Sequence, residues 1–202
     1  MRGLEIGYES MKCPSLSDLP LPRYDRVGWP WTVESRFDAE SHSPTKSWPK
    51  ISVVVPSLNQ SEFIEETLRS ILLQAYPNFE LFVMDAGSTD GTVEILHKYS
   101  RWVTFWRSHR DGGQAAAINE GLQLSTGDIL CYLNSDDIFC AGAFFSVARE
   151  FEVTAYSTPR LFAFEGTIRD TDGRETSVPP SQENYVTPWL SSAHSLFQPA
   201  CF

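Results

Sequence analysis

The chain has 202 residues, of which 42% are hydrophobic and 21% are charged. This composition is typical of a globular protein with one domain, with or without an appended arm, and it excludes disordered and collagen-like chains. The 26 acidic and 16 basic residues give a formal net charge of −10, which argues against a nucleic-acid partner bound through its phosphates. No apolar run approaches the ~20 residues of a membrane span.

The start of the chain carries charged residues and lacks the apolar segment of a secretory signal. The four cysteines contain no C-x-x-C pair, and the apolar surroundings of Cys131 and Cys140 predict reduced residues of the core. We therefore expect a cytoplasmic protein. The composition leaves open a peripheral contact with the inner face of a membrane.

The segment 1–49 differs from the rest of the chain. It holds six of the 13 prolines and three of the six tryptophans, and it shows neither helical nor strand periodicity. A disordered leader and an ordered arm both fit this pattern. The rings of Trp29, Trp31 and Trp48 favour an arm that packs on the main domain, because large aromatic rings are costly to leave in water.

From residue 51 onwards, apolar runs alternate with amphipathic segments. The first run, 51–55, is β-branched and stops at Pro56, which predicts a buried strand. A helical stripe follows over 61–75, with Asn59 and Glu62 as its start signal. By the same criteria we expect further strands over 79–85, 102–106 and 129–133, and further helices over 92–99, 112–124 and 141–150.

Strand and helix thus alternate roughly every 25 residues between 51 and 150. This spacing predicts an α/β fold, in which a mostly parallel sheet is joined by right-handed crossovers and covered by helices on both faces. The alternation stops beyond residue 152. There, the segments 161–168 and 175–178 flank a turn at 170–174, which is typical of a hairpin.

Polar residues and glycines gather where the predicted strands end, at 56–60, 85–88, 107–114 and 134–137. In an open parallel sheet, ligands bind beyond the carboxyl ends of the strands. A sheet with a purely structural role would not require this distribution. The sequence therefore predicts a ligand site at this edge of the sheet.

The fourth strand end carries two adjacent acids, Asp136 and Asp137. Neighbouring carboxylates repel each other, and a divalent cation relieves that repulsion. Mg²⁺ or Mn²⁺ suits such a pair, because these ions take one or two protein carboxylates and complete their shell with water and substrate phosphates. The alternative is that one of the acids caps the following helix.

Two other strand ends carry weaker signals. Asp85 ends a buried strand and could accept a hydrogen bond from a nucleotide base or a ribose, whereas we expect Asp90 to cap a helix. Gly113 and Gln114 open an alanine-rich helix, whose N-terminus suits an anion such as a diphosphate. A plain helix start explains the same residues, and neither a Walker loop nor a dinucleotide fingerprint is present.

Together, four segments in this order carry a resemblance: ISVVVPSLNQ, FVMDAGSTDGT, DGGQAAAINEG and TGDILCYLNSDD. Over about residues 48–150 the chain resembles the family-2 inverting glycosyltransferases with the Rossmann-like GT-A fold. The segments Gly28–Thr32 and Gln198–Ala200 are similar to a bacterial subgroup of that family.

The resemblance implies a metal-assisted, inverting transfer from a nucleotide-diphosphate sugar to a glycan or lipid-linked acceptor, as in polysaccharide biosynthesis. It divides the chain into an arm (1–49), a nucleotide-sugar-binding domain (50–150) and the incomplete start of an acceptor-side region (151–202). The metal ligands would be Asp136 first and Asp137 second, for Mn²⁺ or Mg²⁺. The residues implied for the nucleotide sugar are Pro56, Leu58, Asn59, Asp85, Gly113, Gln114, Asn134 and Ser135.

The chain departs from the family pattern at three positions. Leu58 stands where the family often has tyrosine, Ala86 replaces a frequent second aspartate, and Asn134 replaces the first aspartate of the metal motif. An inverting transferase also needs a general base, and the resemblance puts that base beyond Phe202, so we assign none.

A catalytically incomplete nucleotide-binding fragment or pseudoenzyme is therefore the second hypothesis. A nucleotidyltransferase is disfavoured because its basic, glycine-rich loop is missing. A dehalogenase-type phosphatase is disfavoured because Gly87 stands where it needs a second aspartate.

Overall fold

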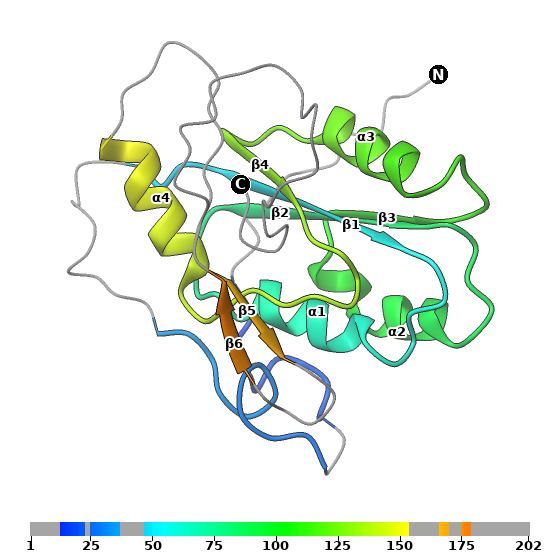
Figure 1. Cartoon of the computed structure of the whole chain (residues 1–202), viewed down its shortest axis with the longest axis horizontal. Helices are drawn as coiled ribbons and strands as arrows, with labels where there is room; N and C mark the ends of the chain where they lie inside the picture. The colour runs from blue at the N-terminus through cyan, green and yellow to red at the C-terminus, as the bar shows by residue number, and fades with distance from the viewer. Residues whose placement is uncertain (1–12, 23–24, 37–46, 154–165, 170–174, 179–202) are drawn as a thin grey trace.

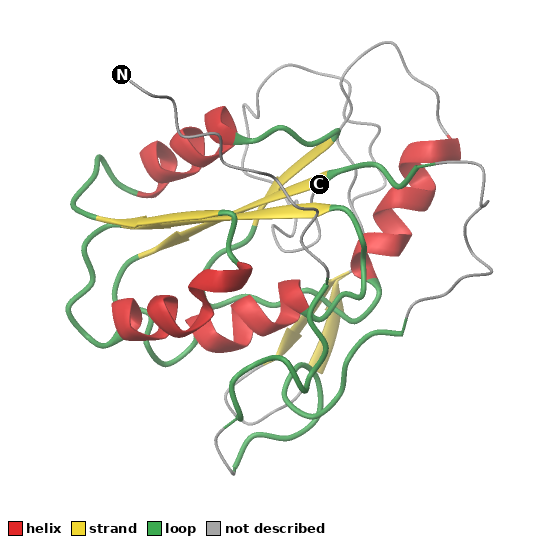
Figure 2. Ribbon diagram, turned by 180° about the vertical axis from the view of Figure 1, so that it is seen from behind, coloured by secondary structure: helices red, strands yellow, loops and turns green. Residues whose placement is uncertain are grey.

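The computed structural model describes residues 13–22, 25–36, 47–153, 166–169 and 175–178. Its main sheet has the order β3-β2-β1-β4, and all its neighbouring strands are parallel, which confirms the predicted α/β class. Helix α3 covers one face, while α1 and α2 cover the other (Figures 1 and 2). The strands are β1 (Ile51–Ser57), β2 (Phe79–Asp85), β3 (Phe105–Ser108) and β4 (Ile129–Tyr132), and the helices are α1 (Ile64–Leu72), α2 (Thr92–Tyr99), α3 (Gln114–Leu124) and α4 (Ala143–Val153).

The strands separate two hydrophobic clusters because successive side chains point to opposite faces. On β1, Val53 and Val55 join the larger cluster, with residues of α1, α2 and α4, whereas Val54 joins a small cluster with Ala117 of α3. Both faces of β1 and β2 are buried along their whole length. This explains why their sequences are continuous apolar runs rather than alternating ones.

The predicted bounds of β1 and β3 were wrong. Strand β1 runs through Pro56 to Ser57. The backbone nitrogen of Pro56 points towards the β4 side of the strand. The pairing with β4 has already ended there, opposite Val54, so the N–H that proline lacks is not needed for the ladder. The third strand begins at Phe105 rather than at residue 102, because a 3₁₀ turn, η2 (Ser100–Trp102), extends α2.

The predicted start of the first helix was also wrong. Helix α1 begins at Ile64, after a turn at 61–63, and has no side-chain cap. Asn59 instead has a positive φ of 53° and accepts a hydrogen bond from the backbone N–H of Thr89. The start signal of Asn59 and Glu62 therefore marks a loop contact rather than a cap.

The described part of the N-terminal segment packs on the sheet domain, as its tryptophans led us to expect. Trp31 is buried, and the indole of Trp29 donates to the carbonyl of Phe139. The guanidinium of Arg69, fully buried on α1, donates to the carbonyls of Pro20, Pro30 and Trp31. These contacts hold the segment against the outer side of α1.

The hairpin expected beyond residue 152 is present in the described residues. Strands β5 (Gly166–Arg169) and β6 (Glu175–Val178) pair antiparallel, while the rest of 154–202 lies outside the described residues, including the turn at 170–174. Cys131 is buried as expected, whereas Cys140 is exposed, which corrects the prediction that it lies in the core.

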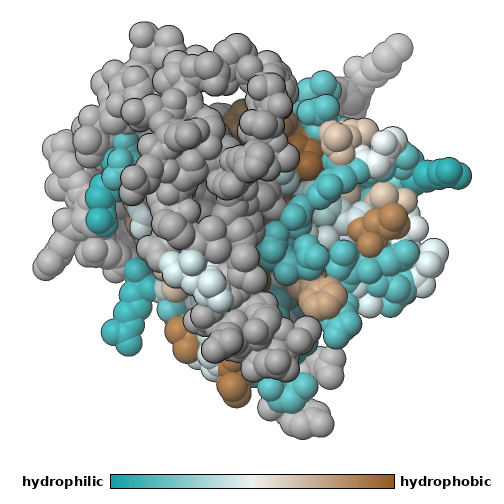
Figure 3. All heavy atoms as spheres, viewed as in Figure 1, coloured by the Kyte–Doolittle hydropathy of each residue, from teal (hydrophilic) through white to brown (hydrophobic). Residues whose placement is uncertain are grey.

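The exposed surface of the described residues is mixed in character. Hydrophobic side chains lie scattered among hydrophilic ones on the face that Figure 3 shows. No helix within the described ranges combines the length and the apolar character that crossing a bilayer requires.

The close approach of α3 to the sheet depends on Gly121. A Cβ atom at this position would lie 2.5 Å from Cγ1 of Val54 on β1. Valine is stiff about its χ1 angle, so Val54 cannot turn away to make room. Gly121 therefore sets the distance between α3 and β1, and with it the place of the α3 N-terminus above the sheet edge.

We expect Gly121→Ala to lower the free energy of unfolding by about 1–2 kcal/mol, because overpacking outweighs the roughly 1 kcal/mol that alanine contributes to helix propensity. Urea unfolding followed by circular dichroism measures the change. A Val54→Ala background should relieve the clash, so the double variant should be less destabilised than the sum of the two single variants. Strict additivity would contradict this account of the α3 contact.

Candidate functional site

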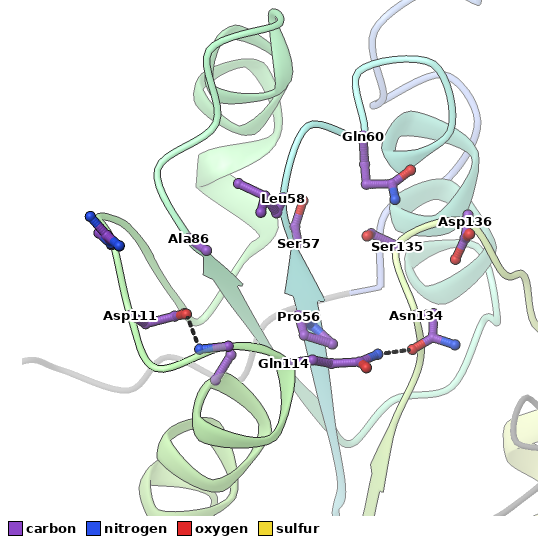
Figure 4. Close-up of a pocket in the computed structure, with 13 residues that line it drawn as sticks. Pro56, Ser57, Leu58, Gln60, Ala86, Asp111, Gln114, Asn134, Ser135 and Asp136 are labelled. Carbon is purple, nitrogen blue, oxygen red and sulfur yellow. Dashed lines mark hydrogen bonds between the residues drawn. The ribbon is translucent and has the colours of Figure 1, made fainter.

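A cavity of about 470 Å³ lies beyond the carboxyl ends of the strands. Residues that follow β1, β2, β3 and β4 all contribute to its walls, together with the first turn of α3 (Figure 4). The parallel register brings these ends together, with Ser57 opposite Asp85 and Asp85 opposite Ser108. The cavity therefore lies at the edge of the sheet that the sequence predicted.

Seven of the ten predicted site residues line this cavity. They are Pro56, Leu58, Gly113, Gln114, Asn134, Ser135 and Asp136. The lining does not include Asn59, Asp85 or Asp137. A ligand contact of these three residues stays a prediction, and their side chains have other partners in the structure.

The segment 134–137 after β4, here called the acidic turn, presents one of its two carboxylates to the cavity. Asp136 is exposed and lines the cavity, and no partner is found for its carboxylate within the described part of the chain. Asp137 is half-buried and accepts a hydrogen bond of 3.0 Å from the side-chain amide of Asn134. Burial raises the pKa of Asp137, as does the charge of Asp136, while the bond from Asn134 lowers it.

Asn134 also ties the acidic turn to α3. Its Oδ1 accepts a hydrogen bond of 2.7 Å from Nε2 of Gln114 across the cavity (Figure 4). Both side chains line the cavity. The amide of Asn134 therefore connects the α3 N-terminus to the turn that carries Asp136 and Asp137.

The donor set suits a divalent ion that takes most of its ligands from a substrate. The described residues contain no cluster of three His, Cys, Asp or Glu side chains, which a self-sufficient protein cage would need. Mg²⁺ and Mn²⁺ sites next to phosphates commonly use one or two carboxylates and complete the shell with water and phosphate oxygens. The single free carboxylate of Asp136 fits this arrangement.

The carboxylate of Asp85 has a structural role. It is fully buried and accepts hydrogen bonds from the backbone N–H groups of Gly87 and Ser88 and from the hydroxyls of Ser88 and Ser108. These bonds occupy both carboxylate oxygens and close the turn after β2. Ala86, the next residue, lines the cavity in its place.

Asp90 also holds a loop. It precedes Gly91, the N-cap of α2, and its carboxylate accepts hydrogen bonds from the backbone of Ser61 and from both the backbone and the hydroxyl of Thr92. Burial acts to raise the pKa of Asp90, but the bonds from Thr92 and Ser61 outweigh it and hold the pKa below its usual range. Asp90 thus joins the first turn of α2 to the loop after β1.

Arg107 orders the segment between β3 and α3, which forms part of the cavity wall. Its buried guanidinium donates to the carbonyl of Asp85 and pairs with the carboxylates of Asp111 at 3.0 Å and Glu120 at 2.6 Å. Burial acts to lower the pKa of Arg107, but the two acids outweigh it and raise the pKa. The ion pairs fix Asp111, which in turn accepts from the N–H of Gly113 at the start of α3.

Sequence reasoning missed six lining residues: Ser57, Gln60, Ala86, Arg110, Asp111 and Ala117. Five of them lie in the strand-end segments that the sequence singled out, so adjacency to a strand end was the available signal. Ala117 is one turn into α3 and carried no such signal. Among the described lining residues, Arg110 is the only cationic side chain, which suits an anionic ligand.

The fold and the place of the cavity are those of an α/β ligand-binding domain, and comparison with known proteins assigns the family. The chain belongs to glycosyl transferase family 2, whose model matches residues 52–191. Over 92 residues it is 36% identical to the putative teichuronic acid biosynthesis glycosyltransferase TuaG of Bacillus subtilis, covering 44% of this chain and 36% of the relative. It is 35% identical to glycosyltransferase AglE of Haloferax volcanii over 97 residues, covering 46% and 32% of the two chains.

A solved structure supports the fold assignment. The mannosyltransferase PcManGT of Pyrobaculum calidifontis, solved with GDP-Man and Mn²⁺, is similar with a TM-score of 0.50 and 27% sequence identity. The match covers 59% of this chain and 39% of that one. The predicted GT-A fold is thereby confirmed. The matched part of the chain spans about a third of the length of the curated relatives, 36% of TuaG and 32% of AglE.

The structure distinguishes two carboxylates that look alike in the sequence. We expect Asp85→Asn to lower the free energy of unfolding by about 1–3 kcal/mol, because an amide would face donors that need an acceptor. The same substitution at Asp136 should change it by less than about 0.5 kcal/mol. Chemical denaturation of both variants tests this contrast, and equal stabilities would refute the structural role of Asp85.

Proposed function

We propose that this chain binds a nucleotide-diphosphate sugar in the cavity beyond β1, β2 and β4 and, with a divalent metal ion, transfers its sugar to a glycan or lipid-linked acceptor with inversion. The observation that carries the proposal is the free carboxylate of Asp136, which lines the same cavity as the N-terminus of α3. Family membership supports a transferase, and the Mn²⁺ and GDP-Man of PcManGT support the choice of metal and donor.

Different residues of the cavity would bind different parts of the nucleotide-sugar donor. Pro56, Leu58 and Ala86 provide an apolar wall for the flat face of a base. The start of α3, from Gln114 onwards, offers backbone N–H groups and the positive end of the helix dipole to the diphosphate. Arg110 adds a positive charge to the same wall.

Gly113, which precedes the first residue of α3, has a left-handed backbone with a φ of 98°. A residue with a side chain adopts that conformation only at a cost, whereas glycine does so freely. Among the residues that the structure describes, no atom outside its chain neighbours lies within 4 Å of where its Cβ would be, so these residues leave the approach to the α3 N-terminus open.

Asp136 would hold the metal ion, for which we propose Mn²⁺ or Mg²⁺. When bound, such an ion neutralises the charge that develops on the diphosphate leaving group as the bond to the sugar breaks. Asn134 would keep Asp137 and Gln114 in place through the hydrogen bonds that it forms with each of them. We assign no general base, since the other carboxylate of the described lining, Asp111, is paired with Arg107.

Calorimetry of the 202-residue chain with UDP-, GDP- and dTDP-sugars, each with and without Mn²⁺, tests donor binding. We expect at least one donor to bind in a metal-dependent way. Asp136→Ala should abolish the metal-dependent part while the protein stays folded. Glu94→Ala, which removes an exposed carboxylate on α2 away from the cavity, is the matched control and should bind like the wild type.

Two results would contradict the proposal. A folded wild-type chain that binds none of these donors would refute donor binding, and unchanged metal-dependent binding by Asp136→Ala would refute the metal ligand. Sugar transfer to an acceptor by the 202-residue chain would exclude the alternative that it binds nucleotides without catalysis.

A further inference from the structure

Helix α1 and the turn that follows it carry a buried polar stripe made of Thr67, Ser70 and Gln74. All three residues are fully buried, and none of them lines the cavity. Each forms a hydrogen bond to the connection between β4 and α4, which begins with the acidic turn. In Figure 1 this connection runs from the end of β4 past α1 towards α4.

Thr67 holds the acidic turn itself. Its hydroxyl lies 2.9 Å from the carbonyl oxygen of Ser135 and 2.8 Å from that of Asp137. A hydroxyl has one proton to donate, so the two carbonyls share it. The two acceptors belong to the residues before and after Asp136. The hydroxyl of Thr67 therefore holds the backbone that carries the Asp136 side chain.

The other members of the stripe bind farther along the chain. The hydroxyl of Ser70 accepts from the N–H of Phe139, and the amide of Gln74 donates to the carbonyl of Cys140. These bonds hold the approach to α4 rather than the acidic turn. Within the stripe, the contact on both sides of Asp136 is thus specific to Thr67.

The turn needs such support because it forms few backbone bonds of its own. The backbone N–H of Asp137 bonds to the carbonyl of Asn134, and Leu133 forms the preceding ladder bond to β1. The side chain of Asp136 is exposed, and the described residues provide no contact that would orient it. Removing a group that sets the orientation of a metal ligand typically lowers the metal affinity about 10- to 100-fold.

We propose that Thr67 is a positioning residue, which aims the carboxylate of Asp136 into the cavity by holding the carbonyls on both sides of it. This inference rests on the proposed function, because it assigns to Asp136 a divalent ion bound together with a nucleotide diphosphate. Thr67 touches neither the ion nor the nucleotide and acts only through the backbone of the turn.

The test compares Thr67→Val, which keeps the shape and removes the hydroxyl, with Thr67→Ser, which keeps the hydroxyl. The affinity for Mn²⁺ is measured by calorimetry at saturating UDP or GDP, and the affinity for the same nucleotides is measured separately in EDTA. Ser70→Ala is the matched control, because it removes a buried hydroxyl of the same helix whose partner lies outside the acidic turn. Thermal unfolding of each variant reports its stability.

We expect Thr67→Val to weaken Mn²⁺ binding roughly 10- to 100-fold while binding of the nucleotides in EDTA stays unchanged. Thr67→Ser and Ser70→Ala should keep the wild-type Mn²⁺ affinity, even if Ser70→Ala lowers the melting temperature. Wild-type Mn²⁺ affinity in Thr67→Val would overturn the role of Thr67 alone. An equal loss of Mn²⁺ affinity in Ser70→Ala would also overturn it, as would an equal loss of nucleotide affinity in EDTA for Thr67→Val. Either result would indicate general destabilisation. A wild-type chain that binds neither nucleotide with Mn²⁺ would overturn the proposed function as well.

Discussion

The parallel register of β1 with β2 and β4 is the constraint on which the rest of the structure depends. It places Ser57 beside Asp85 and ends the β4 ladder at Tyr132, opposite Val54. Because all strands run in the same direction, their carboxyl ends meet at one edge of the sheet, and the loops that follow them share one cavity. Residues separated by up to 80 positions in the chain, from Pro56 to Asp136, meet there for this reason.

Several polar side chains near that edge form hydrogen bonds or ion pairs within the loops and so are not available to a ligand. Asp85 closes the turn after β2, Asp90 joins α2 to the loop after β1, and Arg107 orders the segment before α3. Among the described residues, the groups left free for a ligand include Asp136, Arg110 and the α3 N-terminus. Such a division suits a binding site, because free groups keep their direction only when the backbone beneath them is held rigid.

The two sides of the sheet make different contributions to this arrangement. On the α3 side the core is small, and Gly121 lets the helix lie close to Val54. On the other side α1 supplies both apolar residues for the main core and a polar stripe for the β4–α4 connection. A helix that is buried on nearly all sides can carry polar residues inward, provided that each finds a hydrogen-bond partner. The N-terminal segment covers its remaining side through Arg69.

The sequence by itself determined the class of fold, the order of strands and helices through α4, and the strand ends where ligands would bind. It could do so because hydrophobic periodicity and turn residues are local signals. It predicted a ligand contact for both Asp85 and Asp136, since each carboxylate stands at the end of an apolar strand. Only the tertiary structure distinguished the two, because Ser88 and Ser108 satisfy Asp85 while the turn after β4 leaves Asp136 exposed. The same holds for Thr67, which reads as part of an amphipathic stripe and gains its role from a turn that lies 68 and 70 residues away along the chain.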